Sequence, residues 1–223
     1  MIKLQDVHAY YEDPFSRKKN YILKGIDLEI APNQSIGIMG PSGSGKSTLA
    51  KIILKIMPIS KGKYFYFDKD ITFANPKAIK DFRAKIQYLP QSPGSYFDGS
   101  YLLKHSILEP LGNFNKSVDY DKLDELIEIL QLRKNLLDRY PHQVSGGEIQ
   151  RLSLLRILLL EPQLIILDEA TSMLDISVQA NILSLLKELR EIKKLSYLII
   201  SHSFLLSEYM CDKIYVFKDG KLT

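Results

Sequence analysis

The 223-residue sequence is poor in cysteine and has no long apolar stretch. Its single cysteine, Cys211, cannot form an internal disulfide, so the chain is compatible with a reducing compartment. The longest apolar runs are Leu152–Leu160, which Arg156 interrupts, and Leu164–Leu167. Both fall short of the ~20 residues that a helix needs to cross a bilayer, and residues 1–6 lack the apolar stretch of a signal peptide. We therefore expect no part of the chain to enter a membrane unaided.

The sequence also lacks a dominant sign of charge. Lysine and arginine number 30 against 26 aspartates and glutamates, and the formal net charge is +4. The two signs are interspersed, and the tight basic run Arg17-Lys18-Lys19 lies in a predicted loop. This balance suits a solvated surface better than a nucleic-acid groove, so we expect no nucleic-acid partner. With 45% hydrophobic and 25% charged residues, the composition is that of a cytosolic globular protein.

Short strands and helices alternate at both ends of the chain. Apolar or alternating segments predict strands at 2–7, 26–30, 35–39, 164–167, 197–200 and 213–217, and helices are predicted at 48–56, 178–192 and near 204–210. Between about residues 76 and 160 the pattern is largely helical, with a buried stripe of Leu123, Leu126, Ile127 and Leu130 at helical spacing. The sequence predicts an α/β core (about 1–75 and 161–223) with a parallel sheet, and an inserted helical lobe (about 76–160).

A glycine-rich stretch, Gly40 to Thr48, lies between a predicted strand and a predicted helix. Gly40, Gly45, Lys46 and Ser47 occupy the required places of a phosphate-binding loop. We expect Lys46 to reach the β- and γ-phosphates and the Ser47 hydroxyl to bind Mg²⁺. Successive backbone N–H groups would form the phosphate nest, together with the helix dipole. The other residues of this predicted site are Pro41, Ser42, Gly43, Ser44 and Thr48.

The apolar run Leu164–Leu167 ends in two carboxylates, Asp168 and Glu169. A parallel strand delivers its C-terminal residues to the sheet edge where ligands usually bind. We expect Asp168 to bind Mg²⁺, through water, and Glu169 to orient and polarise the attacking water. With the glycine-rich loop, this pair predicts a P-loop ATPase or GTPase.

A second candidate anion site, Ser145-Gly146-Gly147-Glu148, opens the predicted helix before Asp168. A hydroxyl, backbone N–H groups and the helix dipole converge there, although the same residues also suit a simple helix cap. With this segment, the chain resembles the ABC ATPase family over essentially its whole length. Residues 144–151 resemble the family signature, which usually has Leu and Gln where this chain has Val144 and Glu148.

The resemblance implies a P-loop core with a mostly parallel sheet, an N-terminal antiparallel β part and an inserted helical subdomain. It also implies that a second cassette, identical or homologous, takes part in the site: the signature of one subunit closes on the ATP of the other. Ser145, Gly146, Gly147 and Glu148 would then bind the partner's nucleotide, and we expect Glu148 to leave the phosphate contacts of Ser145 and the glycines intact.

Three further residues resemble family elements. Tyr11 is similar to the aromatic residue that stacks on adenine, with Tyr10 as the alternative. Gln91 is similar to the glutamine that touches Mg²⁺ and links the core to the helical lobe. His202 is similar to the histidine that contacts the γ-phosphate. Ser172-Met173-Leu174-Asp175 resembles the loop that crosses the dimer interface. The resemblance implies an active ATPase that uses ATP and Mg²⁺, with Lys46, Glu169 and His202 as catalytic residues.

Residues 10–23, 107–111 and 139–143 resemble the nickel and oligopeptide import branch. This implies an ATPase subunit at the cytoplasmic face of the inner membrane, peripheral to it. It would work with transmembrane permease subunits and an extracytoplasmic substrate-binding protein to import nickel, a chelated metal or peptide. Because peptide members usually continue past the position of Thr223, we expect a metal. The alternative is a soluble ABC-type ATPase that acts on nucleic acid or ribosomes. Tyr96 and Phe97 are expected to be exposed and to contact the permease.

Overall fold

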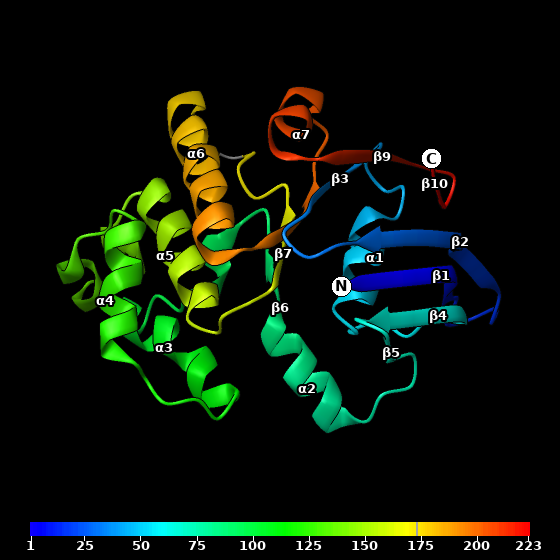
Figure 1. The fold of residues 1–223 in the computed structure, drawn as a ribbon, viewed down its shortest axis with the longest axis horizontal. Helices are drawn as coiled ribbons and strands as arrows, with labels where there is room; N and C mark the ends of the chain where they lie inside the picture. The colour runs from blue at the N-terminus through cyan, green and yellow to red at the C-terminus, as the bar shows by residue number, and fades with distance from the viewer. Residues whose placement is uncertain (173) are drawn as a thin grey trace.

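The computed structural model describes residues 1–172 and 174–223 (Figure 1). Its first sheet has four antiparallel strands in the order β2-β1-β4-β5. The alternation predicted for the start of the chain holds for Ile2 and Leu4, and an irregularity before Val7, where Asp6 has φ +46°, brings Val7 and Ala9 to the buried face as well. The strands are β1 (Ile2–Glu12), β2 (Lys19–Ile30), β4 (Lys61–Tyr66) and β5 (Lys69–Asp70).

The second sheet has six strands in the order β10-β9-β3-β8-β7-β6. All neighbours in it are parallel except β10 and β9, which pair antiparallel. This mostly parallel sheet beside an antiparallel one confirms the predicted fold class. Its strands are β3 (Ser35–Met39), β6 (Ile86–Leu89), β7 (Leu164–Asp168), β8 (Ser196–Ile200), β9 (Lys213–Lys218) and β10 (Lys221–Leu222).

Seven α-helices and three 3₁₀ helices complete the described part of the chain. In Figure 1, α3, α4 and α5 gather on the side of the six-stranded sheet that is remote from the antiparallel sheet. The α-helices are α1 (Lys46–Ile53), α2 (Pro76–Lys85), α3 (Leu103–Asn113), α4 (Tyr120–Ile129), α5 (Gly146–Leu158), α6 (Ile176–Lys193) and α7 (Phe204–Met210). The 3₁₀ helices are η1 (Pro93–Tyr96), η2 (Lys134–Asp138) and η3 (Pro141–Gln143).

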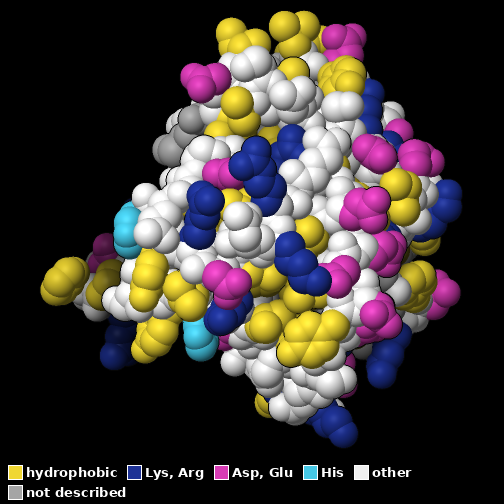
Figure 2. All heavy atoms as spheres, turned by 90° about the vertical axis from the view of Figure 1, so that its left-hand side faces the viewer, with side chains coloured by type: hydrophobic (Ala, Val, Ile, Leu, Met, Phe, Trp, Pro, Cys, Tyr) yellow, Lys and Arg dark blue, Asp and Glu magenta, His cyan; other side chains and the backbone are white. Residues whose placement is uncertain are grey.

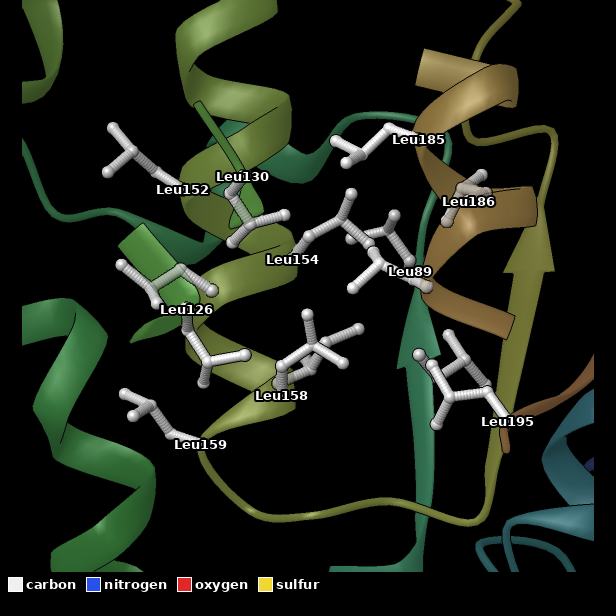
Figure 3. Close-up of a cluster of buried hydrophobic side chains, with 14 of the residues drawn as sticks. Leu89, Leu126, Leu130, Leu152, Leu154, Leu158, Leu159, Leu185, Leu186 and Leu195 are labelled. Carbon is white, nitrogen blue, oxygen red and sulfur yellow. The ribbon is translucent and has the colours of Figure 1, made fainter. Parts of the chain in front are cut away.

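The six-stranded sheet separates two hydrophobic cores. Along β7, Leu164 and Ile166 join the core that contains α1 and the antiparallel sheet. Ile165 and Leu167 join the core that contains α3, α4, α5 and α6. Figure 3 shows leucines of α5 and α6 converging with Leu89 of β6 in this second core. Burial on both faces explains why the parallel strands are continuously apolar.

The helical region departs from the sequence prediction in two elements. No strand was predicted within this largely helical region, but residues 86–89 form β6, which pairs with β7 in the six-stranded sheet. The helix α3 was not predicted, and neither were β4 and β5. The stripe of Leu123, Leu126, Ile127 and Leu130 is buried as expected. The proposed division into a core and a lobe at residues 76 and 160 stays a prediction.

Tyr96, the last residue of η1, and Phe97, which follows it, were both expected to be exposed, and this expectation is wrong. Phe97 is only 7% exposed and belongs to the helical core. Tyr96 is partly buried, because its hydroxyl donates to the carbonyl oxygen of Tyr88 (2.8 Å) and the Arg156 guanidinium lies over its ring. Tyr101 is the more accessible ring of this region, at 57% exposed.

No helix in the described residues combines the length and the apolarity needed to cross a membrane. The face formed by α3, α4 and α5 carries lysine and arginine side chains intermixed with aspartate and glutamate (Figure 2). Several of these charges are paired, as in Lys104–Asp138 (3.0 Å) and Lys134–Asp124 (2.7 Å). This visible face therefore shows the mixed charge pattern expected from the sequence.

Candidate functional site

The glycine-rich loop joins β3 to α1 and is held closely by its neighbours. Gly40 has φ +155° and Gly45 has φ +116°, and an added Cβ would lie 2.3 Å from the Phe217 carbonyl oxygen and 2.7 Å from Ile22, respectively. Either contact requires the neighbour to shift, so glycine is needed at both positions. Gly45 is the N-cap of α1, and no side chain caps this helix end. Backbone N–H groups of the first turn are therefore available to an anion.

The Lys46 side chain lies across this loop. Its ammonium group donates to the carbonyl oxygens of Gly40 (2.8 Å) and Pro41 (2.8 Å), and the residue is only 7% exposed. A cation that lies on a glycine-rich loop at a helix N-terminus is suited to phosphate oxygens. The contact of Lys46 with the β- and γ-phosphates stays a prediction.

Asp168 ends β7 beside α1. The Ser47 hydroxyl donates to Asp168 Oδ2 (3.2 Å), which brings together two of the three residues predicted to contact Mg²⁺, the third being Gln91. The described residues contain no group of three His, Cys, Asp or Glu side chains that would hold a metal alone. Mg²⁺ usually takes one or two protein oxygens and completes its shell with phosphates and water. The hydroxyl and carboxylate oxygens at this sheet edge fit that ion.

Tyr88 also contacts Asp168 and was not predicted from the sequence. Its hydroxyl donates to Asp168 Oδ2 (2.9 Å). Burial, followed by the neighbouring Asp168 charge, raises the pKa of Tyr88, so the hydroxyl keeps the proton that it donates. The contact depends on the parallel pairing of β6 and β7, which places Tyr88 opposite Ile166. We infer that Tyr88 positions the Asp168 carboxylate.

Glu169 sits where three strand ends meet. It has φ +49°, a left-handed conformation that is uncommon for a residue with a side chain, and its N–H donates to the Ile200 carbonyl oxygen (2.9 Å). Gln91 Nε2 donates to Glu169 Oε2 (3.4 Å) and to Ser172 Oγ (3.4 Å). His202 Nδ1 lies 3.4 Å from Glu169 Oε1. The segments after β6, β7 and β8 thus bring Gln91, Glu169 and His202 together at the carboxyl edge of the sheet, where open α/β sheets bind ligands.

The Ser145–Glu148 segment lies at the start of α5 and bonds to itself. The Ser145 N–H and hydroxyl both donate to Glu148 Oε2 (2.8 and 2.9 Å), and the Glu148 N–H donates to Ser145 Oγ (3.3 Å). Ser145 and Gly146 are exposed. Within the described part of the chain, no hydrogen bond joins Ser145, Gly146, Gly147 or Glu148 to the loop at 40–48. One subunit therefore assembles the sheet-edge residues but not this segment.

Tyr11 is placed by the alternation of β1. It follows Val7 and Ala9 on the face that packs with α1 in one core, and it is 46% exposed at the strand's end. Tyr10 lies on the opposite face, where its ring packs against Tyr21 (5.3 Å between centroids). The register favours Tyr11 over Tyr10 as a ring that faces the α1 side. Of the predicted interface loop, Met173 lies outside the described residues.

The sequence matches the family described as ABC transporter over residues 23–172. It is 35% identical to the metal-staphylopine import system ATP-binding protein CntF of Staphylococcus aureus, over 100% of this chain and 89% of the relative. It is 34% identical to the oligopeptide transport ATP-binding protein OppF of Streptococcus mutans, over 93% of this chain and 70% of that protein. It is 32% identical to the nickel import ATP-binding protein NikE of Pseudomonas putida, over 96% of this chain and 81% of that protein.

Two solved structures share the architecture over the whole chain. A dimeric bacterial ABC transporter cassette superposes with a TM-score of 0.85 at 26% identity, covering 100% of this chain and 96% of that one. The cassette cbiO1 from Clostridium perfringens, part of the ABC transporter complex cbiONQ, superposes with a TM-score of 0.87 at 26% identity. The superposition covers 100% of this chain and 86% of cbiO1. A further structure of the dimeric cassette holds ADP and phosphate after hydrolysis.

Proposed function

Because the chain belongs to the ABC transporter family and is the ATP-binding, ATP-hydrolysing subunit of an importer, we propose that two such cassettes share each ATP between them. The loop and sheet edge of one subunit would hold the nucleotide, and Ser145, Gly146, Gly147 and Glu148 of a second cassette would close over it. The separation of these two groups within one chain supports this arrangement. The second cassette is either identical or homologous.

The observation that carries the proposal is the cluster at the carboxyl edge of the sheet. Ser47 and Asp168 share a hydrogen bond there, next to the Glu169–His202 pair. Lys46 and the N–H groups of residues 40–48 would hold the β- and γ-phosphates. Glu169 would accept a proton from the attacking water, and His202 would hold the γ-phosphate. Phosphoryl transfer needs mainly positioning and charge neutralisation, which these groups supply.

Mg²⁺ fits this cluster through Ser47 and Asp168, and bound there it supplies positive charge to the phosphates. Gln91, which donates hydrogen bonds to Glu169 and Ser172, is the third residue that we propose to contact Mg²⁺. Tyr11 would stack on the adenine with its exposed ring at the end of β1.

ATP hydrolysis by the purified subunit tests the proposal. We expect phosphate release that requires Mg²⁺ and stops when the metal is chelated, together with ATP-dependent pairing of subunits in light scattering. Hydrolysis that continues at full rate with the metal chelated would contradict the Ser47–Asp168 assignment. Hydrolysis by a strictly monomeric protein would contradict the shared site.

Permease subunits are the proposed membrane partners. The relatives carry names of nickel, metal-staphylopine and oligopeptide import systems, so we infer a nickel, chelated-metal or peptide importer. The subunit would then lie at the cytoplasmic face of the membrane, in a system that includes an extracytoplasmic substrate-binding protein. A groove of about 590 Å³ beside η1 and α3 offers a docking surface, and its lining includes Tyr101, His105 and Glu109.

We expect Tyr101→Ala to weaken association with the permease by about 2 kcal/mol or more, because exposed aromatic anchors are typical interface hot spots. Co-purification of the subunit with membranes measures this, and Tyr120→Ala, which removes another exposed ring at the start of α4, is the control. If the Tyr101→Ala variant co-purified with membranes as well as the wild type does, the permease would dock on a different surface of the subunit. Fractionation of the wild type with ribosomes or DNA would instead support the alternative of a soluble ATPase.

A further inference from the structure

The N-terminus of α5 carries an acidic residue that occupies the donors of its own segment. We propose that Glu148 acts as a latch: it holds the Ser145 hydroxyl and N–H against itself and so opposes closure of this segment onto the partner's ATP. The inference rests on the shared-site function proposed above. It adds that the approach of ATP-loaded subunits has to break a contact within each subunit.

The hydrogen bonds define the latch. A serine hydroxyl has one proton, and the Ser145 proton points to Glu148 Oε2 (2.9 Å). The Ser145 N–H donates to the same oxygen (2.8 Å), so one carboxylate oxygen takes both donors of that residue. A γ-phosphate from the partner needs a donor, and Ser145 can supply one only after its hydroxyl turns away from Glu148. The Gly146 and Gly147 N–H groups are not taken by this carboxylate.

The charge of Glu148 adds to the effect. The Ser145 N–H bond lowers the pKa of Glu148, and the positive charges of Arg139 and Arg133 lower it slightly further, so the side chain is ionised at neutral pH. The positive end of the α5 dipole favours an anion at this place, and Glu148 already fills that role. A phosphate that arrives at the same N–H groups meets a neighbouring negative charge, which repels it.

A purely structural role for Glu148 is the competing explanation, since reciprocal bonds between an N-cap serine and a glutamate three residues later stabilise a helix start. The two explanations predict different results for Glu148→Gln. Glutamine keeps an acceptor for the Ser145 N–H and removes the charge. If capping were the whole role, the substitution would leave pairing unchanged or weaken it. If Glu148 is a latch, the substitution strengthens ATP-dependent pairing.

The experiment uses the full chain carrying Glu169→Gln, so that bound ATP persists, and measures the ATP concentration at which half of the protein is dimeric by sedimentation. We expect Glu148→Gln to lower this concentration several-fold, up to about tenfold, as removal of one repulsive charge contact permits. Glu128→Gln removes an equal charge from an exposed position on α4 and is the matched control, with no expected change. Steady-state hydrolysis by Glu148→Gln without Glu169→Gln should show a lower KM for ATP.

Glu148→Ala separates the cap from the charge. We expect it to lower the melting temperature, because the cap is lost, whereas Glu148→Gln melts close to the parent. An unchanged or raised half-dimerisation concentration in Glu148→Gln, with normal melting, would overturn the latch while leaving the shared site intact. If the parent protein itself shows no ATP-dependent dimer, the shared site fails instead, and the latch with it.

Discussion

The two halves of the proposed ATP site differ in how they are built. The half at the sheet edge is complete within one chain: Ser47 bonds to Asp168, and Glu169 contacts Gln91 and His202. In the signature half, at the start of α5, the Ser145 hydroxyl and N–H both donate to Glu148. In the proposed shared site, pairing of subunits, and not folding alone, would complete the phosphate contacts.

The two halves also differ in their support. Asp168 follows a strand that is buried on both faces, whereas Ser145 is an exposed helix cap. The body of α5 is held in the core, where its leucines pack with Leu167 and Gln150 Nε2 donates to the Ala170 carbonyl oxygen (2.7 Å). We infer that the sheet edge is the fixed part of the site and that the exposed start of α5 is the part that meets the partner. Four experiments test this comparison.

Glu169→Gln should have the largest effect, because it removes the proposed base while the amide keeps the shape of the side chain. We expect hydrolysis to fall by about 10²-fold or more, with ATP binding retained and an ATP-bound dimer accumulating. Phosphate release and light scattering measure the two effects. Glu188→Gln, on an exposed position of α6, is the control for the lost charge. Near-normal turnover by Glu169→Gln would remove this residue from the mechanism.

Mixing subunits tests whether the halves act in trans. Lys46→Ala damages the sheet-edge half and Ser145→Arg damages the signature half, so each variant alone should be almost inactive. In an equimolar mixture, random pairing gives half heterodimers with one complete site each, and activity should recover to at most about a quarter of wild type. Hydrolysis is assayed across mixing ratios. High activity of Ser145→Arg alone would show that the signature half is dispensable.

Tyr11→Ala should have a smaller effect, confined to nucleotide affinity. Stacking of one base on an aromatic ring is worth ~1–3 kcal/mol, so we expect KM for ATP to rise about tenfold with kcat little changed. Tyr11→Phe should restore the affinity, since a ring without the hydroxyl still stacks. Tyr10→Ala is the matched comparison, because that ring packs with Tyr21 on the other face of β1. A greater loss in Tyr10→Ala than in Tyr11→Ala would reverse the assignment.

Tyr88→Phe should have the smallest effect. It deletes one hydrogen bond to Asp168 and leaves the Ser47 bond in place, so we expect a several-fold rise in the Mg²⁺ concentration for half-maximal hydrolysis. Tyr66→Phe deletes a comparable hydroxyl that donates to Gln163, just before β7 begins, and serves as the control. An equal shift in both variants would mean that the effect is on folding and not on Asp168.

The sequence predicted the residues at the sheet edge better than the contacts between them. Gly40–Thr48, Asp168 and Glu169 stand out because each lies directly after an apolar strand. Tyr88 was missed because β6 was missed: it has four residues and starts where α2 ends, with no glycine or proline between them. Only the parallel pairing of β6 with β7 brings Tyr88 to Asp168, and no local pattern encodes that pairing.

The helical region was harder to predict for similar reasons. The helix α4 shows a clean apolar stripe and was predicted, whereas α3 carries Pro110 inside it, which interrupts the helical signal. The burial of Phe97 was also missed, because a turn-rich stretch predicts exposure and only the packing of η1 against α5 reverses it. The latch at Glu148 depends on side-chain direction at a helix start, which the motif spacing alone leaves open.

Because β7 is buried on both faces, it restricts which insertions and substitutions this chain can accept as its sequence evolves. Inserting one residue between Leu164 and Leu167 would send each following side chain to the wrong core and carry Asp168 past Ser47. Exchanging one aliphatic residue there for another of similar volume disturbs far less. Strand length should therefore be under stricter selection than residue identity in β7. Insertions are expected instead at solvent-exposed turns such as residues 13–18 between β1 and β2.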